Sequence, residues 1–168
     1  MPKILGITFI IFISLIEFSF AEKKIAFIDI DKIINESELG KKSYKKIEND
    51  FKKENEKLLK VEKKLISDEQ EILNQKNILS KEELNNKINK LKKEINDFKK
   101  KKRLINEKFN KIRIDKTNEM VQSLNTILSK YADENDISLV IQKKFIVIAK
   151  SGLDITNEVL KIFNKENK

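Results

Sequence analysis

Apolar side chains recur every seven residues through the middle of this chain, in two successive stretches. The first stretch has its column at Tyr44, Phe51, Leu58, Leu65, Ile72 and Leu79, and the second at Leu84, Leu91, Phe98, Ile105 and Ile112. The residues around both columns are mostly charged. Heptads that continue this long between charged flanks are typical of coiled-coil helices. The pattern therefore predicts two long helices, each with one apolar seam.

A short interruption separates the two stretches. The residues NQKNILS break the seven-residue period, and Ser80 with Glu83 three positions later is the signature of a capping box that starts a new helix. Because the two arms are similar in length and joined by few residues, we expect an antiparallel helical hairpin over residues 41–116, with its tip near 76–82. Each arm should be about 55–60 Å long at ~1.5 Å per residue.

Strand-like patterns lie near both ends of the chain. Lys24–Ile30 is a short, nearly continuous apolar run with β-branched residues, which is typical of a strand buried on both faces. Ile137–Gln142 and Phe145–Ala149 are two further runs, separated by Lys143 and Lys144. This second pair predicts a β-hairpin.

Short helices are also predicted near both ends of the chain. Ser37 is a plausible cap in a stretch of helical spacing, and Asp154 or Thr156 is expected to cap a last short helix over VLKIF. The expected fold class is α+β, mostly α. A small β-body is formed from both chain ends, residues 22–40 and 117–168, and the coiled-coil hairpin is inserted between them.

The predicted body is too small to be stable on its own. Roughly 60 residues bury too little surface for a stable core, and strands that are apolar on both faces leave open edges. We therefore expect self-association through the sheet. The residues predicted to form the body and its subunit contacts are Ile25, Phe27, Ile28, Leu139, Ile141, Phe145 and Val147.

The first 21 residues predict export. A short basic start precedes the largely apolar run Ile4–Ile16, and Ser19 and Ala21 are small residues at the positions that a signal peptidase requires. We expect cleavage after Ala21. The alternative is an uncleaved membrane anchor, but Glu17 interrupts the apolar run before the roughly 20 residues that a spanning helix needs.

Composition removes several classes of function. The chain contains no Cys, no His and no Trp. Catalytic pairs that use a thiol or an imidazole are therefore impossible, and so are zinc sites built from Cys or His. No pair of carboxylates is marked by its spacing as a catalytic pair. We expect no enzyme, no cofactor and no metal.

Positive charge is concentrated on the predicted arm. Residues 41–116 contain 25 Lys or Arg against 14 Asp or Glu, whereas the rest of the chain after Ala21 contains 10 against 12. Such an asymmetry usually separates a part that meets partners from a part that folds. The densest run is KKKKR, Lys99–Arg103, which lies between Phe98 and Phe109.

Three segments together carry a resemblance to a known family. These are KIAFIDIDKI at residues 24–33, ES-x-x-GK at 36–41, and DISLVIQKKFIVIAKSGLDITNEVLK at 136–161. With the preceding leader and the charged coiled coil, they resemble the Skp family, the OmpH-like periplasmic chaperones of outer-membrane proteins. The match is most specific at Asp136–Ile141 and around Asp154-Ile155-Thr156.

The resemblance implies a trimer whose β-body joins strands of three subunits, and whose three arms enclose a cavity. It implies that unfolded outer-membrane β-barrels, here called clients, are held soluble in the periplasm without ATP. Members of the family carry basic residues on the returning arm, which is where Lys99–Arg103 lie. Contact with anionic lipid or lipopolysaccharide has also been proposed for the family.

The basic run has two interpretations. Five consecutive residues at about 100° each encircle a helix, so they cannot form one face. Lys102 falls on a seam position and should keep its stem against Phe98 and Ile105. The run is either a solvated part of the helix or a positive lining that attracts acidic clients. Nucleic acid is not expected, because export removes the protein from it and no aromatic stacking platform accompanies the charge.

An additional apolar column, Leu59, Ile66 and Leu73, accompanies the first seam at about 100° around the helix. It either widens the contact with the return arm, against Leu104 or Ile114, or offers unspecific apolar contacts to a client. The candidate client-binding residues are Leu59, Ile66, Leu73, Phe98, Lys99, Lys100, Lys101, Lys102, Arg103 and Phe109.

The sequence thus favours an exported, ATP-independent holdase. Two other classes of function stay open. One is a structural coiled-coil spacer, which would have no affinity for denatured protein. The other is a module that binds anionic membrane surfaces through its basic arms, which would lose its binding at moderate salt.

Overall fold

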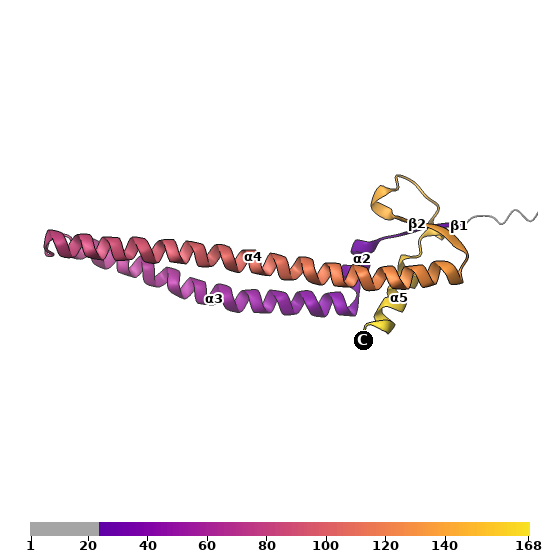
Figure 1. The fold of residues 1–168 in the computed structure, drawn as a ribbon, viewed down its shortest axis with the longest axis horizontal. Helices are drawn as coiled ribbons and strands as arrows, with labels where there is room; N and C mark the ends of the chain where they lie inside the picture. Colours follow the sequence, from indigo (N-terminus) through magenta and orange to yellow (C-terminus); the bar gives the residue numbers. More distant parts are fainter. Residues whose placement is uncertain (1–23) are drawn as a thin grey trace, which may run out of the picture.

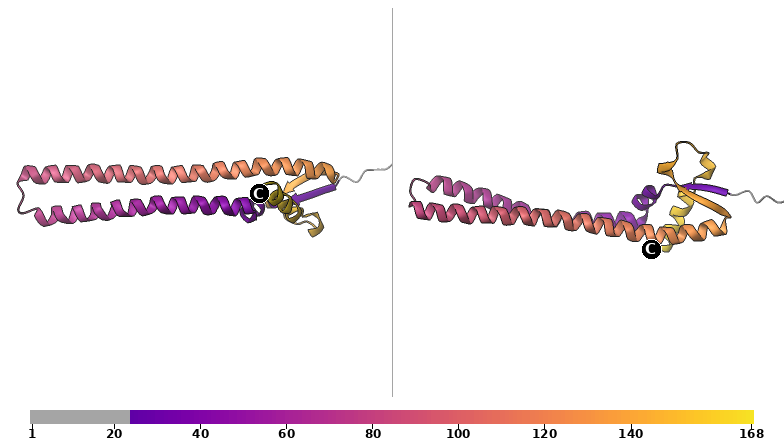
Figure 2. Two further views of the ribbon diagram at one scale, coloured as in Figure 1. Left: turned by 90° about the horizontal axis from the view of Figure 1, so that it is seen from below. Right: turned by 45° about the horizontal axis from the view of Figure 1, so that its top comes forward.

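Two long helices form the hairpin that the heptads predict. The computed structural model describes residues 24–168, so the expected leader and its cleavage site lie outside the described residues. Helix α3 spans Glu38–Gln75 and helix α4 spans Lys81–Glu134. They run side by side and project from a small body at one end of the molecule (Figures 1 and 2).

The seam of the hairpin is narrow. Leu58, Leu65 and Phe109 are buried between the helices, while most other seam residues are only half-buried. The rings of Phe51 and Phe109 meet edge to face across the seam, with centroids 5.2 Å apart. At the tip, the Ser80 hydroxyl accepts from the Glu83 amide and the Glu83 carboxylate accepts from the Ser80 amide. The predicted capping box is confirmed.

The sheet has two parallel strands that come from opposite ends of the chain. Strand β1, Lys24–Ile28, pairs with strand β2, Ile137–Gln142, so that Ile25 faces Leu139. The strands are parallel because the hairpin carries the chain out and back, and β2 then begins beside the start of β1 (Figure 1). The predicted fold class, α+β and mostly α, is confirmed.

The predicted β-hairpin after Ile137 is wrong. Residues Lys143–Phe145 form the 3₁₀ turn η1, and Phe145–Ala149 is not a strand. Lys143 and Lys144 would be the two turn residues of such a hairpin, and neither is a Gly, Asn or Asp, which tight two-residue turns favour. Instead the chain crosses to the second edge of β1, where Asp154 forms a parallel bridge with Phe27.

Short helices cover the sheet and complete one core. These are α2 (Ile30–Glu36), the 3₁₀ turn η2 (Ser151–Leu153) and α5 (Thr156–Glu166). The body end of α4 supplies Met120, Leu124 and Ile127 to this core, so the same helix that forms the arm also anchors it. The core side chains are Ala26, Ile28, Ile33, Ile34, Met120, Leu124, Ile127, Ile155, Val159 and Phe163.

A tight junction joins the body to the arm. Ser37 is fully buried and caps α3, as expected, because its hydroxyl accepts from the Gly40 amide at 3.1 Å. Gly40 lies so close to α2 that a Cβ on it would be 1.8 Å from the Ile34 carbonyl oxygen. The ES-x-x-GK motif therefore encodes a capped, close-packed corner between two helices.

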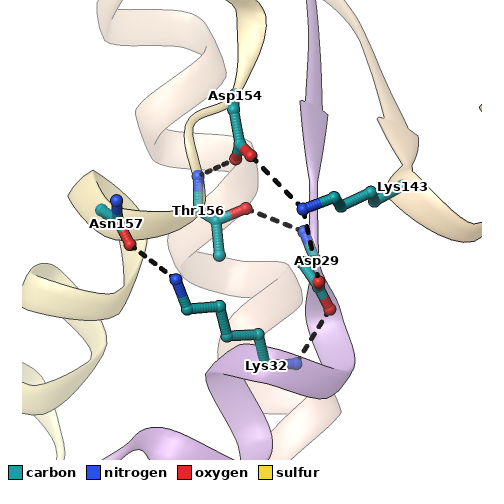
Figure 3. Close-up of polar contacts among 6 residues, drawn as sticks. All are labelled: Asp29, Lys32, Lys143, Asp154, Thr156 and Asn157. Atoms are coloured by element: carbon teal, nitrogen blue, oxygen red, sulfur yellow. Dashed lines mark hydrogen bonds and ion pairs between the residues drawn. The ribbon is translucent and has the colours of Figure 1, made fainter. Parts of the chain in front are cut away.

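A polar cluster ties the two ends of the chain together (Figure 3). The Asp29 carboxylate accepts from the Lys32 amide and caps α2, and the Asp29 amide donates to the Thr156 hydroxyl at 2.9 Å. The Thr156 amide donates to the Asp154 carboxylate at 2.9 Å. The prediction that Asp154 or Thr156 caps the last helix is wrong, because the N-cap of that helix is Ile155, which makes no side-chain cap hydrogen bond. Thr156 is the first residue of the helix, and its hydroxyl binds the other end of the chain.

Charge reinforces this cluster. The Lys143 ammonium lies 3.8 Å from carboxylate oxygens of both Asp29 and Asp154. Desolvation raises the pKa of Asp154, but the hydrogen bonds from Thr156 and the positive charges of Lys143 and Lys32 outweigh it and hold the pKa below its ordinary value of 3.8. The ionised form of Asp154 is therefore favoured in the folded state.

Acid should weaken the body through Asp154. A carboxyl group whose folded pKa is depressed stabilises the fold above its unfolded pKa and loses that contribution as the pH falls through the folded pKa. The variant Asp154→Asn should lose about 1 kcal/mol of unfolding free energy at neutral pH. In urea titrations, the unfolding free energy of this variant should also fall less than that of the unchanged protein between about pH 5 and pH 3. Asp97→Asn, on the exposed arm, is the control; an equal decline in both variants would exclude Asp154 as the source.

Candidate binding surface on the helical arm

The additional apolar column of α3 is exposed along its whole length. Leu59, Ile66 and Leu73 have exposed fractions of 47%, 55% and 58%. The two residues that could have covered the column, Leu104 and Ile114, are themselves about half exposed on α4. This exposure favours the interpretation in which the column is available to a client over the one in which it widens the contact with the return arm.

The basic run encircles α4, as its spacing predicts. All five side chains of Lys99–Arg103 are exposed. The Lys102 ammonium folds back over the ring of Phe98, 5.9 Å from its centroid, which agrees with the expected seam position. Counted from the Phe51–Phe109 pair along two antiparallel helices, Lys101 lies level with Leu59.

The two phenylalanines that flank the run are not alike. Phe98 is half-buried, whereas Phe109 is only 9% exposed and belongs to the seam. The edge of the Phe109 ring still lines hollows on both sides of the hairpin. Phe109 therefore offers a floor to these hollows and does not project from the surface.

Lysines of both helices converge on one flank of the seam. The Lys57 ammonium donates to the Glu54 carboxylate at 2.6 Å. This hydrogen bond lowers the pKa of Glu54, and the charges of Lys108 and Lys101 act in the same direction, against a smaller effect of desolvation. Since α3 supplies Lys57 and α4 supplies Lys101 and Lys108, this flank is basic on both sides.

Two adjoining hollows lie along this flank. One, of about 520 Å³, lies at the root of the arm and has an apolar floor that includes Leu39, Ile47 and Met120. The next, of about 550 Å³, lies further along the arm. Both are lined by Asp50 and Ile112, so they form one continuous depression. This depression was not predicted from the sequence, although Lys46, Lys53 and Lys60 recur every seven residues beside the apolar seam.

The net positive charge of the arm comes entirely from its root half. Residues 41–60 and 99–116 contain 17 Lys or Arg against 6 Asp or Glu. Residues 61–98, which form the tip half, contain 8 of each sign. Most of the apolar column lies in this neutral half, so the arm presents charge near the body and apolar side chains toward the tip.

The body also exposes apolar residues that were predicted to meet other subunits. Ile25, Leu139, Phe145 and Val147 are about half exposed or more, and Ile141 is half-buried. Phe27 and Ile28 are buried within the chain. The neighbour Ile148 was not singled out in the sequence, yet its exposed fraction is 89%.

Two further properties concern the part of the chain that the structure describes. None of its helices combines the length and the apolar character that crossing a bilayer requires. Within residues 24–168, no group of three or more Asp or Glu side chains is arranged to hold a metal ion.

Comparison with known proteins places this geometry in a family. The family model described as outer membrane protein (OmpH-like) matches residues 24–163. A solved structure from Caulobacter crescentus CB15, a candidate OmpH-like outer membrane chaperone, has the same fold, with a TM-score of 0.79 and 16% sequence identity over 87% of this chain and 86% of that chain. Comparison with curated proteins gives no match. The chain therefore belongs to the OmpH-like family, a family of periplasmic chaperones that are not enzymes.

Proposed function

We propose that the protein is an ATP-independent holdase that captures unfolded outer-membrane β-barrel proteins and prevents their aggregation before assembly. The observation that carries this proposal is the exposed apolar column Leu59, Ile66 and Leu73 on a long, narrow arm. Each of these side chains keeps about half of its surface exposed, so the row is available for contact with a bound polypeptide.

Charge and apolar contact have different tasks in this mechanism. The positive root half of the arm attracts acidic unfolded chains and speeds their capture without fixing one pose. The apolar column then holds the client through weak, unspecific contacts. Release follows when a folding site binds the client better, so no nucleotide is needed.

We further propose that the working form is an oligomer, with three subunits as the family resemblance implies. Support comes from Phe145, Val147 and Ile148, which are strongly exposed in one chain although they are large and apolar. Pairing between subunits would cover this segment and the free edge of β2. Several arms would then project from one body and enclose a client. A monomer at micromolar concentration in analytical ultracentrifugation would contradict this assembly.

Light scattering tests the holdase function directly. A urea-unfolded outer-membrane β-barrel is diluted into buffer with and without the protein, which is produced from the full-length chain. We expect suppressed scattering near one oligomer per client. In the same assay, the variant with Leu59→Ser, Ile66→Ser and Leu73→Ser combined should need on the order of tenfold more protein for the same suppression, at unchanged helicity.

The control variant removes apolar area elsewhere on the arm, through Leu104→Ser and Ile114→Ser. It should retain clients as well as the unchanged protein. Suppression that persists in the column variant would remove the column from the mechanism. No suppression by the unchanged protein would overturn the holdase function and favour the spacer. Binding to anionic vesicles without any client effect would favour the membrane-surface module.

A further inference from the structure

The depression on the basic flank of the arm has the form of a binding groove. We call it the lysine groove. Seven lysines and four carboxylates line it, and the carboxylates are Asp50, Glu54, Glu56 and Glu119. The apolar members lie along the seam between α3 and α4, and the charged members stand on either side. The groove thus combines an apolar floor with a charged rim.

The rim has more lysines than carboxylates to neutralise them. Glu54 receives the hydrogen bond of Lys57, Asp50 lies 3.9 Å from Lys53, and Glu119 pairs with Lys116. Four other lysines of the rim have no carboxylate within 4.0 Å among residues 24–168, and these are Lys42, Lys46, Lys60 and Lys108. No ion pair holds these four ammonium groups, and that of Lys108 lies 5.9 Å from the centroid of the Phe109 ring, at the edge of the floor.

The other flank of the same part of the arm provides a comparison. Its hollow, of about 620 Å³, is lined by one acidic and one basic residue, Glu48 and Arg113, beside Tyr44 and two asparagines. The Arg113 guanidinium lies 5.4 Å from the centroid of the Tyr44 ring. Two hollows of similar size therefore differ in charge, and only the lysine groove favours acidic ligands.

The length of the lysine groove defines the size of its ligand. From Leu39 to Lys60 the groove follows 21 steps of α3, which is about 30 Å at ~1.5 Å per residue. An extended polypeptide advances ~3.3 Å per residue, so about nine or ten residues fill this length. A transmembrane β-strand has about 9–11 residues.

We propose that the lysine groove binds one extended client segment of about ten residues in which apolar and acidic side chains alternate. Successive side chains of an extended chain point in opposite directions. One set can therefore face the apolar floor while the carboxylates reach the ammonium groups of the rim. This inference deepens the proposed function and rests on it, because it specifies which part of an unfolded β-barrel the root half of the arm recognises.

Fluorescence anisotropy with a labelled peptide of alternating Val and Glu, about ten residues long, tests the groove. Its affinity should exceed that of the matched Val and Gln peptide and should fall with salt. A peptide of half this length should bind more weakly, and lengthening the peptide by half should not raise its affinity. The variant Lys42→Gln, Lys46→Gln, Lys60→Gln and Lys108→Gln should lose about tenfold in affinity.

The matched control carries the same loss of charge outside the groove, through Lys41→Gln, Lys45→Gln, Lys52→Gln and Lys63→Gln. All eight lysines are exposed on helices, so circular dichroism should show the same helicity in both variants. A control that keeps the affinity of the unchanged protein supports the groove. Equal losses in both variants would mean diffuse attraction by net charge, and would overturn the groove.

The scattering assay separates this inference from the holdase function. If the unchanged protein suppresses aggregation but the groove and control variants bind the peptide equally, the groove is overturned and the holdase stands. If the unchanged protein does not suppress aggregation, the holdase fails, and a selective loss of peptide affinity in the groove variant would still establish an acidic-peptide site.

Discussion

Gly40→Ala should destabilise the protein strongly, although alanine normally stabilises a helix relative to glycine by about 1 kcal/mol. The new Cβ would lie 1.8 Å from the Ile34 carbonyl oxygen and 2.9 Å from the Ser37 hydroxyl. The first contact is with backbone, so relief requires that α2 move away from α3. We expect a loss of about 3 kcal/mol or more, from a total stability that in domains of this kind is about 5–15 kcal/mol.

Thermal unfolding followed by circular dichroism measures this loss, and Gly152→Ala is the matched control. A Cβ at Gly152 would meet nothing within 4 Å, and its φ is not positive. That substitution should leave the melting temperature within a few degrees of the original or raise it slightly. If both alanine variants have the same melting temperature, the close approach of Gly40 to the Ile34 carbonyl oxygen does not constrain the fold.

Phe163→Ala should remove most of the stability of the body. Phe163 is fully buried and is the largest of the completely enclosed side chains, and it packs from α5 into the single core. Substitutions of this kind cost about 3–5 kcal/mol. The body offers few other contacts to compensate, because its core consists of ten buried residues and a surrounding half-buried layer.

Urea unfolding gives the free energy for this variant, and Ile78→Ala provides the comparison. Ile78 is also large and apolar, but at the tip its exposed fraction is 84%, so its removal should change the unfolding free energy by less than about 0.5 kcal/mol. A loss in Phe163→Ala as small as this would mean that α5 is not an essential part of the core.

The hairpin could be predicted from the sequence because its determinants are local. Each seam residue of the Leu58 column needs only its neighbours on the same helix to define the apolar face, and the Ser80–Glu83 capping box fixes the start of α4. Ser37 was recognisable as a cap for the same reason. By contrast, the pairing of strands depends on contacts between residues that are far apart in the sequence.

The β-hairpin prediction failed at this point. Phe145–Ala149 has the composition of a strand, but Asp154 takes the second edge of β1, and Lys143 is held by Asp29 and Asp154. The contacts of Asp154 with β1 and of Lys143 with Asp29 join positions more than a hundred residues apart, and no periodicity reveals them. Composition alone cannot tell a strand from an exposed apolar segment.

The candidate site was predicted in part. The sequence identified the column of Leu59, Ile66 and Leu73, but its exposure depends on how α3 is rotated against α4, which heptads do not define. Phe109 was predicted to face a client beside the basic run, whereas its ring is packed into the seam against Phe51. The lysine groove escaped notice because its two sides come from different helices, and each side alone resembles a solvated face.

The parallel pairing of β1 with β2 has a consequence for folding kinetics. Ile25 and its partner Leu139 are separated by 114 residues, and closing so long a loop of disordered chain is slow. Once α3 and α4 have paired from their tip, the distance in space between the two strands is only about the width of two helices. We expect the hairpin to form first and the sheet to close last. Because β1 lies before the arm in the sequence and β2 after it, β1 must remain unpaired until the whole arm has formed.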